Sequence, residues 1–560
     1  MPGRHLDLVF LWHMHQPDYR DHASGEFMLP WVLLHAIKDY ADMAAHLERH
    51  PRIRAVVNFV PVLLDQIDDY CAQIDTGSYR DPLLRLLARA DLDAIGRDDR
   101  RLLLDTCFRS SHTTMLSPFP HYLRLHTIHQ QMAREGEATL MYLSGAYYAD
   151  LVTWYFLAWS GETERRRVPL LADLMTKGAG YSAEDRRQLL AWVAETLKGI
   201  VPRYRALMER GQIELSATPH SHPLGPLLLD FAAARESLPE APLPQAAAYS
   251  GGRSRLDAHI ANAVASHGAR FGQAPAGMWP AEGAVSASLV AQFARHGLRW
   301  AASGEGVLRN SLKATGERLD RAAYRPWHLP GAEGISLFFR DERLSDLIGF
   351  EYARWHGRDA ANHFVAQLEG ILAATPPGEN AVVGVVLDGE NAWEHYPFNG
   401  YYFFEDLYGL IEAHPSIRTT TYGEIVAREA PPPAGTLRHL TAGSWVYGTL
   451  STWIGDADKN RAWDLLCAAK QSYDLVIGRL APEDARAAEA QLAVCESSDW
   501  FWWFGDYNPS QAVASFDRLF RHNLANLYRL LKLAPPAELD EPISAGSAGA
   551  THDGTMRRAT

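Results

Sequence analysis

Three carboxylates follow directly on short apolar segments of this 560-residue chain. Asp388 and Glu390 come at the end of the apolar run 381–387, and Glu282 follows Trp279 in the segment GMWPAEG. Two carboxyl groups can cleave a glycosidic bond when one attacks the anomeric carbon and the other protonates the leaving oxygen. The neighbouring aromatic side chains could stack on the flat faces of sugar rings. These residue types predict chemistry on a carbohydrate.

Paired histidines occur in similar positions. His13 and His15 follow the first apolar run, and His220 and His222 lie in the segment TPHSHP. Residues i and i+2 of an extended chain project to the same side. Such pairs could donate hydrogen bonds to sugar hydroxyls and tune the pKa values of nearby acids. They could also hold a divalent metal that activates water, as in a metal-dependent α-mannosidase or polysaccharide deacetylase. Either pair could instead be purely structural, so the histidines alone leave these readings open.

Seven short apolar runs must position these residues. Continuous rather than alternating apolarity is typical of parallel strands that are covered on both faces. Helix-like stretches such as 35–50 and 254–267 lie between the runs, which predicts an α/β fold with an incomplete seven-stranded (β/α) barrel. Active sites of such barrels lie at the C-terminal ends of the strands, where the acids and histidines are expected to meet. The runs are 7–12, 55–60, 213–217, 276–280, 298–303, 335–340 and 381–387.

The patterning also divides the chain into parts. Residues 1–430 hold all the predicted strands and form the expected catalytic barrel, with a helical insertion at about 61–205. Helical patterning returns beyond Pro431 and predicts a C-terminal helical domain over 431–533. Residues 534–560 are rich in Pro, Gly, Ser and Ala, which predicts a disordered tail.

Charge and hydropathy limit the expected partners and compartment. The formal net charge is −13 and there is no basic stripe, so a nucleic acid is not expected as a partner. The sequence has no apolar stretch of about 18 residues, so no membrane span is predicted. The apolar run 8–12 is too short for the core of a signal peptide. The four cysteines lie far apart, which is typical of reduced thiols. We therefore expect a cytoplasmic protein.

Longer motifs follow one another in a characteristic order along the chain. This order resembles that of glycoside hydrolase family 57, particularly its α-amylase and amylopullulanase-like branch, over almost all of residues 7–530. The resemblance implies a seven-stranded (β/α) barrel with a C-terminal helical domain, and retaining action on α-glucans without a cofactor or a metal in the chemical step. The motifs are HMHQP (13–17), GQIELSATPHSHP (211–223), GMWPAEGAVS (277–286), FFRDERLSDLIGF (338–350), VVLDGENAWEHYP (385–397), GSWVYGTLSTWIGDADKNRAW (443–463) and ESSDWFWWFGD (496–506).

The resemblance also implies roles for individual residues. Glu282 matches the family's nucleophile and Asp388 its acid/base. Trp445 and Trp453 lie in the motif that closes over the cleft, so the helical domain is expected to complete the cleft. We expect no metal ligand. The other expected substrate contacts are His13, His15, Glu214, His222, Trp279, Arg340, Asp341, Glu390 and Trp393.

The sequence thus predicts an intracellular retaining hydrolase of glycogen, starch or maltodextrin that cuts α-1,4 bonds, with α-1,6 bonds left open. A 4-α-glucanotransferase or a glucan branching enzyme would use the same catalytic pair, because water and a sugar hydroxyl compete for one covalent intermediate. A catalytically silent glycogen-binding protein would need neither acid. Gly304 and His220 depart from the family pattern and bear on substrate length and linkage.

Overall fold

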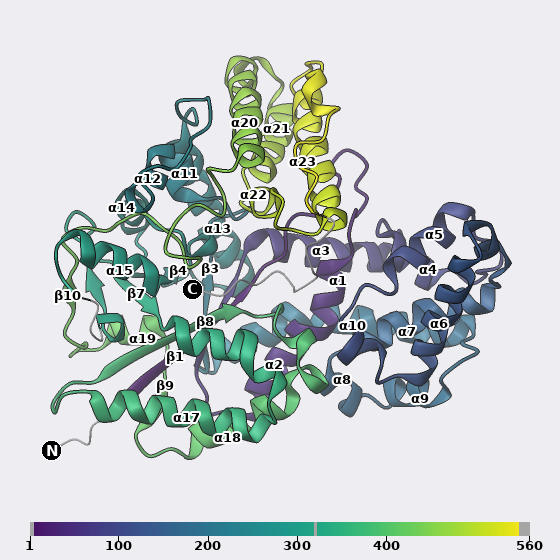
Figure 1. Ribbon diagram of the computed structural model, residues 1–560, viewed down its shortest axis with the longest axis horizontal. Helices are drawn as coiled ribbons and strands as arrows, with labels where there is room; N and C mark the ends of the chain where they lie inside the picture. Colours follow the sequence, from purple (N-terminus) through teal and green to yellow (C-terminus); the bar gives the residue numbers. More distant parts are fainter. Residues whose placement is uncertain (1–4, 319–321, 548–560) are drawn as a thin grey trace.

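The computed structural model describes residues 5–318 and 322–547 (Figure 1). Within this part of the chain, seven parallel strands form a barrel in the order β7–β5–β4–β3–β2–β1–β8, and β8 closes the barrel by pairing with β7. The predicted seven-stranded (β/α) barrel is confirmed. The strands are β1 (Leu6–Met14), β2 (Ala55–Phe59), β3 (Ile213–Ala217), β4 (Gly277–Met278), β5 (Trp300–Gly304), β7 (Ser336–Arg340) and β8 (Ala381–Asp388).

Alternate residues of each strand face the inside and the outside of the barrel. On β1, Val9 and Leu11 pack in an inner cluster, whereas Phe10 and Trp12 pack with the surrounding helices. Every residue of β1 is buried, which explains why its apolarity is continuous. The next inward position after Leu11 is His13, so the same alternation that fills the barrel aims this histidine into its mouth.

Helices surround the barrel, and one of them closes its N-terminal end. α19 (Tyr422–Ala427) places Tyr422 inside the barrel, against Trp300 and Phe338. Three short strands lie at the rim: β6 (Trp327–His328), β9 (Ile417–Thr419) and β10 (Gly435–Thr436). The other barrel helices are α1 (Trp31–His35), α2 (Ala41–Arg49), α3 (Pro61–Thr76), α11 (Gly225–Leu229), α12 (Ala234–Ser237), α13 (Gly252–Phe271), α14 (Ala287–Arg295), α15 (Glu305–Ala314), α16 (Glu342–Asp346), α17 (Gly357–Ala374) and α18 (Tyr401–Ala413).

The stretch between β2 and β3 is helical and extends to one side of the barrel (Figure 1). It ends in α10 (Ala183–Glu209), which begins with a capping box: the Ser182 hydroxyl accepts from the Asp185 amide, and the Asp185 carboxylate accepts from the Ser182 amide. Its extent as an insertion of 61–205 stays a prediction. Besides α3, the α-helices of this stretch before α10 are α4 (Pro82–Ala88), α5 (Arg97–Thr106), α6 (Pro120–Arg134), α7 (Gly145–Ala158), α8 (Glu162–Arg167) and α9 (Pro169–Lys177).

The C-terminal region is helical, as predicted, and stands over the barrel mouth (Figure 1). It consists of α20 (Ala457–Val476), α21 (Pro482–Cys495), α22 (Asp499–Trp503) and α23 (Ser510–Leu530). The short helix α22 lies at the barrel end of the long antiparallel helices. It reaches the strand ends, where Asp499 lies beside His15.

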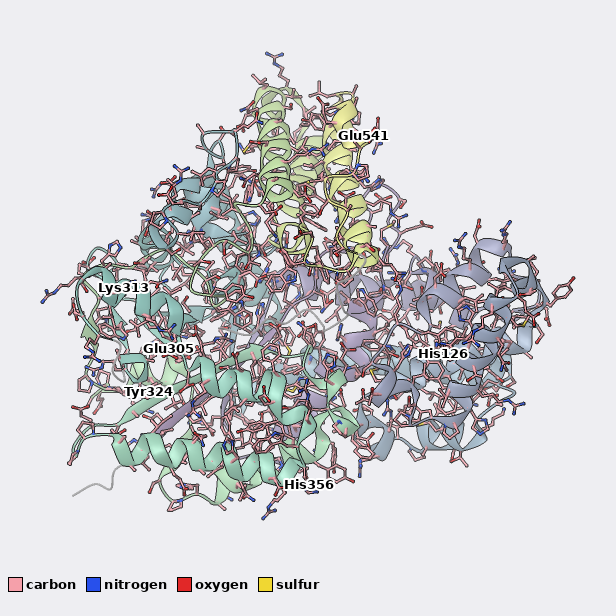
Figure 2. All side chains as sticks on the ribbon, viewed as in Figure 1. His126, Glu305, Lys313, Tyr324, His356 and Glu541 are labelled. Carbon is pink, nitrogen blue, oxygen red and sulfur yellow. The ribbon has the colours of Figure 1, made fainter. Side chains whose placement is uncertain are left out.

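The disorder predicted for the tail differs from the structure over residues 534–547. Leu539 and Ile543 are buried, and the Ile543 amide donates to the Asp517 carboxylate of α23 at 2.7 Å. Figure 2 shows Glu541 beside this helix. Two apolar residues four positions apart anchor the segment, although its average composition resembles that of disordered chains. The remainder of the predicted tail, 548–560, lies outside the described residues.

Within the described ranges, every helix is too short or too polar to cross a membrane. The side chains of Cys71, Cys107, Cys467 and Cys495 are all free thiols.

Candidate active site

A cavity opens at the C-terminal ends of the barrel strands, beneath α22. Eight of the predicted site residues line the cavity, which brings together side chains at the ends of β1, β7 and β8, in the loops after β3 and β4, and in the segment before α20. They are His13, His15, His222, Glu282, Arg340, Asp388, Glu390 and Trp445.

Glu282 occupies a strained backbone position after β4. Its φ of 57° and ψ of 24° lie in the left-handed region, which is unfavourable for a side chain with a Cβ. Trp445 holds this turn twice: its amide donates to the Glu282 carbonyl at 3.2 Å, and its Nε1 donates to the Glu282 carboxylate at 3.2 Å. Backbone strain of this kind is often found where a side chain must be presented to a substrate.

The Glu282 carboxyl sits among other acids. Burial raises its pKa well above the ordinary value, and the negative charges of Asp499 and Asp388 raise it further. The hydrogen bond from Trp445 opposes this shift by favouring the ionised form. An ionised Glu282 is therefore poorly solvated, which makes it a reactive anion.

Asp388 is the last residue of β8 and lies beside His13 of β1 in the strand register. Its Oδ2 accepts a hydrogen bond from Nδ2 of Asn391 at 2.8 Å. Burial raises the pKa of Asp388, while the hydrogen bond from Asn391 and the neighbouring His15 oppose the rise. A carboxyl group that keeps its proton more easily than usual suits a general acid.

The turn after Asp388 is fixed by backbone contacts. The Gly389 amide donates to the His13 carbonyl at 2.7 Å, and a Cβ at this position would overlap the Met14 sulfur. Glu390 follows, and its Oε1 accepts from the His15 amide at 3.1 Å. Burial and the charge of Asp388 raise the pKa of Glu390 well above its usual range.

His13 is oriented by a polar layer just below the cavity. Its Nδ1 lies 2.7 Å from Oδ1 of Asn58, whose amide nitrogen donates to the Ser216 hydroxyl at 2.9 Å. Because Oδ1 can only accept, Nδ1 of His13 carries the proton. Burial and the nearby His15 lower the pKa of His13 to about 3, so the ring is neutral. Its Nε2 is then an acceptor.

The helical region supplies two groups that hold the other histidines. Asp499 of α22 lies 2.9 Å from Nε2 of His15, and the Ser498 hydroxyl lies 2.8 Å from Nδ1 of His222. The Ser498 amide also donates to the His222 carbonyl at 2.9 Å. Sequence reasoning assigned no role to either residue. The available signal was the motif 496–506, where an acid precedes a run of aromatic residues.

His15, His222 and Asp499 are also a group of possible metal ligands, with ligand atoms within 4.8 Å of one another. An imidazole binds a metal through a lone pair in the plane of its ring. The rings of His15 and His222 stack with centroids 3.8 Å apart and planes 22° apart, so their lone pairs do not converge on one ion. The arrangement suits a hydrogen-bonded cluster better than a metal centre, and the expectation of no metal stays a prediction.

Trp445 forms one wall of the cavity. The Arg340 guanidinium lies 4.8 Å from the centre of its ring, and Nη1 of Arg340 donates to the Val386 carbonyl at 3.1 Å. Further aromatic side chains from the helical region line the cavity: Trp502, Trp503 and Phe516. Trp503 and Phe516 stack with their ring centres 4.4 Å apart. The sequence prediction did not assign these three residues to the site.

Two predicted contacts have structural partners away from the cavity. Glu214 lies inside the barrel below the cavity, where it accepts from Nε1 of Trp300 at 2.6 Å and from the Gly423 amide at 2.7 Å. Asp341 caps α16 by accepting from the Leu344 amide at 2.7 Å. Both carboxylates already serve buried donors.

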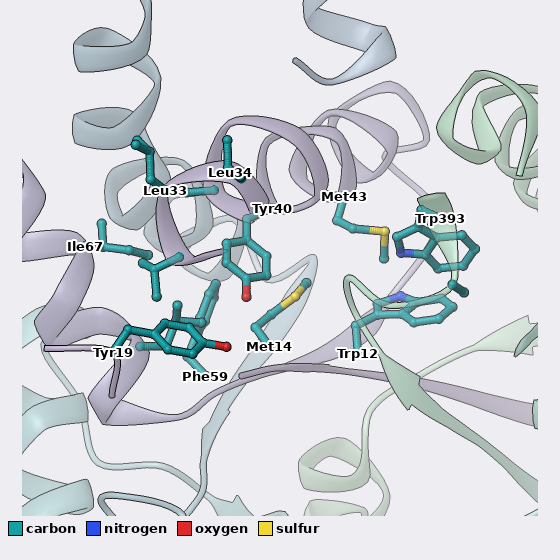
Figure 3. Close-up of a cluster of buried hydrophobic side chains, with 14 of the residues drawn as sticks. Trp12, Met14, Tyr19, Leu33, Leu34, Tyr40, Met43, Phe59, Ile67 and Trp393 are labelled. Atoms are coloured by element: carbon teal, nitrogen blue, oxygen red, sulfur yellow. The ribbon is translucent and has the colours of Figure 1, made fainter. Parts of the chain in front are cut away.

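Three predicted tryptophan contacts are buried behind the cavity wall. Trp393 packs with Trp12 in a hydrophobic cluster outside the barrel (Figure 3), and its Nε1 donates to the Gly389 carbonyl at 2.8 Å. Trp279 lies edge-on to Trp445, with ring centres 5.1 Å apart. Trp453 is fully buried and supports the cavity-lining Trp502. None of these three tryptophans lines the cavity. They pack behind its wall and support the turns and rings that do line it.

The sequence matches a protein-family model over most of its length. The model described as glycosyl hydrolase family 57 matches residues 9–435. A search of curated proteins found no match.

Several solved structures share the fold. The branching enzyme of family 57 type from the hyperthermophilic archaeon Pyrococcus horikoshii is 16% identical, with a TM-score of 0.58 over 95% of this chain and 93% of that one. The α-amylase AmyC from Thermotoga maritima is 14% identical, with a TM-score of 0.55 over 95% and 94%. The 4-α-glucanotransferase from Thermococcus litoralis is 13% identical, with a TM-score of 0.52 over 94% and 60%. At these identities the likeness is one of fold.

Proposed function

The chain belongs to glycosyl hydrolase family 57 and is a glycoside hydrolase-type enzyme, and on that premise we propose that it cleaves α-glucans with retention of configuration. The observation that carries this proposal is the meeting of Glu282 and Asp388 in one cavity. The two side chains come from the ends of β4 and β8, and each has a raised pKa. Glycogen, starch and maltodextrin are the proposed substrates.

The proposed reaction is a double displacement. The Glu282 carboxylate attacks the anomeric carbon, the glycosidic bond breaks, and Asp388 gives its proton to the leaving oxygen. Water then loses a proton to Asp388 and attacks the same carbon, which releases Glu282. Positive charge on the sugar ring in each transition state stabilises the neighbouring carboxylates, although burial disfavours their charge in the empty site.

The remaining polar side chains would bind the reacting sugar. Nε2 of neutral His13 can accept from a sugar hydroxyl, and Arg340 can donate to one. Trp445, Trp502 and Trp503 can stack on further sugar units. Glu390 is positioned to accept from hydroxyl groups in the same cavity.

The stereochemistry of the first product tests the proposal. Retention requires the two carboxyl groups to lie roughly 5–5.5 Å apart, whereas inversion leaves about 6.5–9.5 Å for a water molecule. We expect NMR of a maltooligosaccharide digest to show the α-anomer before mutarotation. An initial β-anomer would mean direct attack by water and would remove the nucleophile role from Glu282.

Transfer to a sugar acceptor is the second candidate, as in a 4-α-glucanotransferase or a branching enzyme. The aromatic side chains that α22 and α23 add to the cavity favour it, since they could hold an acceptor. Product analysis on amylose, glycogen and pullulan separates the candidates: hydrolysis raises the number of reducing ends, whereas transfer redistributes chain lengths or linkages. Loss of activity on chelation, with rescue by zinc, would instead favour a metal-dependent α-mannosidase or polysaccharide deacetylase.

A further inference from the structure

Asn391 lies in the turn that follows the proposed acid/base, and its side chain points back at that residue. Its Nδ2 donates to Oδ2 of Asp388 at 2.8 Å, and it lines the cavity. Nothing in the sequence pattern assigns it a role. An amide nitrogen can only donate, so the Asp388 oxygen that it contacts must offer a lone pair.

The turn between the two residues is held on both sides, so this contact does not depend on a mobile loop. The Gly389 amide donates to β1, and the Gly389 carbonyl accepts from Trp393. Glu390 is tied to the His15 amide. Asn391 therefore meets Asp388 from a backbone that has little freedom to rotate.

The consequence concerns which oxygen of Asp388 carries the proton. With Oδ2 engaged as an acceptor, the acid form places its proton on Oδ1. Glycosylation then delivers this proton from Oδ1, and the attacking water returns a proton to the same oxygen. Without Asn391, the two oxygens would be free to exchange roles by rotation of the carboxyl group.

Other charged or titratable groups also face Asp388, but within the described chain the hydrogen bond to its carboxylate comes from Asn391. They are Glu282 after β4, Glu390 in the same turn, His15 just after β1 and Arg340 of β7. These groups act on Asp388 through charge, which shifts its proton affinity without choosing between Oδ1 and Oδ2.

We propose that Asn391 is the positioning residue of the acid/base: it holds the Asp388 carboxyl so that Oδ1 alone gives and takes the catalytic proton. This inference rests on the proposed function, since it acts through the role of Asp388. It adds a residue whose removal should alter proton transfer more than binding.

The pH profile of kcat/KM tests the proposal in Asn391→Ala and Asn391→Asp. Losing the donor removes a stabilising bond to ionised Asp388, so its pKa rises and the proton is held to higher pH. We expect the alkaline limb to move up by about one pH unit. Asn391→Asp should move it at least as far, because it adds a negative charge. A role in folding alone would lower the whole profile without moving this limb.

A substrate with a good leaving group gives a second readout. A maltosyl fluoride needs no proton at its leaving group, so it bypasses the acid step. We expect Asn391→Ala to lower kcat/KM on maltooligosaccharides by about tenfold to a hundredfold. The fold loss in kcat/KM on the fluoride should be several times smaller. Equal losses on both substrates, or an unmoved alkaline limb, would overturn the proposal.

Two further variants separate the possible failures. His395→Gln changes a partly exposed side chain of the same loop and should leave both readouts unchanged. Asp388→Asn reports on the proposed function itself. If Asp388→Asn stays active on maltooligosaccharides, the acid/base assignment fails. If it is inactive while Asn391→Ala keeps the wild-type limb, only the positioning role fails.

Discussion

Two buried polar clusters join the helical region to the barrel, and they differ in how well their charges are paired. The first centres on Glu496 at the end of α21. Its carboxylate accepts from Nε and Nη2 of Arg255, each at 2.8 Å, from the Tyr249 hydroxyl at 2.5 Å, and lies 2.7 Å from Nε2 of His259. Burial alone would raise its pKa, but these partners lower the pKa to about 2.

The second cluster begins three residues later at Asp499 and contains the proposed catalytic acids. Here Glu282, Asp388 and Glu390 face one another with few donors, and the pKa of each is raised, chiefly by burial. Oε2 of Glu390 is buried without a hydrogen-bond partner among the described residues. The same interface thus holds one cluster whose carboxylate is fully hydrogen-bonded and paired with positive charge. In the other cluster, carboxyl groups with few donors lie close together and repel one another when ionised.

The difference separates what stabilises the fold from what performs chemistry. A buried carboxylate with a full set of donors resists protonation and has little to offer a substrate. Buried carboxylates that lack donors keep their capacity for proton transfer and for attack, and the rest of the fold must hold them in place. Mutations in the two clusters should therefore have opposite effects on activity and stability.

The largest expected effect is on activity, in the second cluster. Glu282→Gln and Asp388→Asn should each lower kcat by roughly three orders of magnitude or more, because each removes a group that the double displacement needs. Steady-state kinetics on maltooligosaccharides measure the loss, and circular dichroism checks the fold. Near-normal activity in either well-folded variant would refute the role assigned to that residue.

The same variants should not lose stability at neutral pH. A carboxyl whose pKa is raised on folding destabilises the folded state as pH rises above its ordinary value. Glutamine at position 282 cannot ionise, so its Tm at neutral pH should equal or exceed that of the wild type. The difference should vanish in acid, where the wild-type carboxyl is protonated. A lower Tm of Glu282→Gln at neutral pH would mean that the Glu282 carboxylate stabilises the fold, as the Glu496 carboxylate does.

The next largest effect should be on stability, in the first cluster. Glu496→Gln leaves the buried Arg255 without its main counter-charge, which costs about 3–5 kcal/mol. Denaturant unfolding measures this loss, while kcat per folded molecule should stay near the wild-type value. Glu489→Gln is the matched control: it removes the exposed partner of the same arginine and should cost less than about 1 kcal/mol.

The pH dependence gives this prediction a sign. The pKa of Glu496 is lowered on folding from its ordinary value of 4.5 to about 2. Its stabilising contribution is fully present above pH 4.5 and is lost as the pH falls towards 2. The stability gap between wild type and Glu496→Gln should therefore narrow over this window. A gap that stays constant would mean that packing, and not charge, carries the effect.

The contrast between the clusters also explains what could be predicted from sequence. His13 and Asp388 end continuous apolar runs, and neighbouring parallel strands bring such ends together whatever the rest of the chain does. Asp499 and His15 are 484 residues apart in the sequence. They meet because the helical region docks on the barrel, and the strand–helix pattern of the barrel does not predict where that region docks. No local pattern reports such a contact.

Residue type alone also did not predict which aromatic and acidic side chains face the cavity. Trp393 and Trp453 have the chemistry of a sugar platform, yet burial in helix packing puts them behind the cavity wall. Glu214 is on a barrel strand and points inward, but it sits three residues before the strand end and so lies below the mouth. Depth along a strand and the side of a helix that faces the core are set by tertiary packing.

The smallest expected effects separate two tryptophans of the helical region. Trp445 donates from Nε1 to the Glu282 carboxylate, whereas Nε1 of the buried Trp453 has no hydrogen-bond partner among the described residues. Trp445→Phe keeps an aromatic ring against Arg340 but loses the donor, so we expect about a tenfold fall in kcat/KM with little change in Tm. Trp453→Phe leaves a small void in the core, which should cost about 1–2 kcal/mol and leave kcat/KM of the folded enzyme unchanged. Kinetics and thermal unfolding of both variants measure the pair. If Trp453→Phe lowered kcat/KM as much as Trp445→Phe, core packing behind the cavity wall would matter for catalysis as much as the hydrogen bond to Glu282. Residues that stabilise the fold and residues that serve the chemistry would then not be separable in this region.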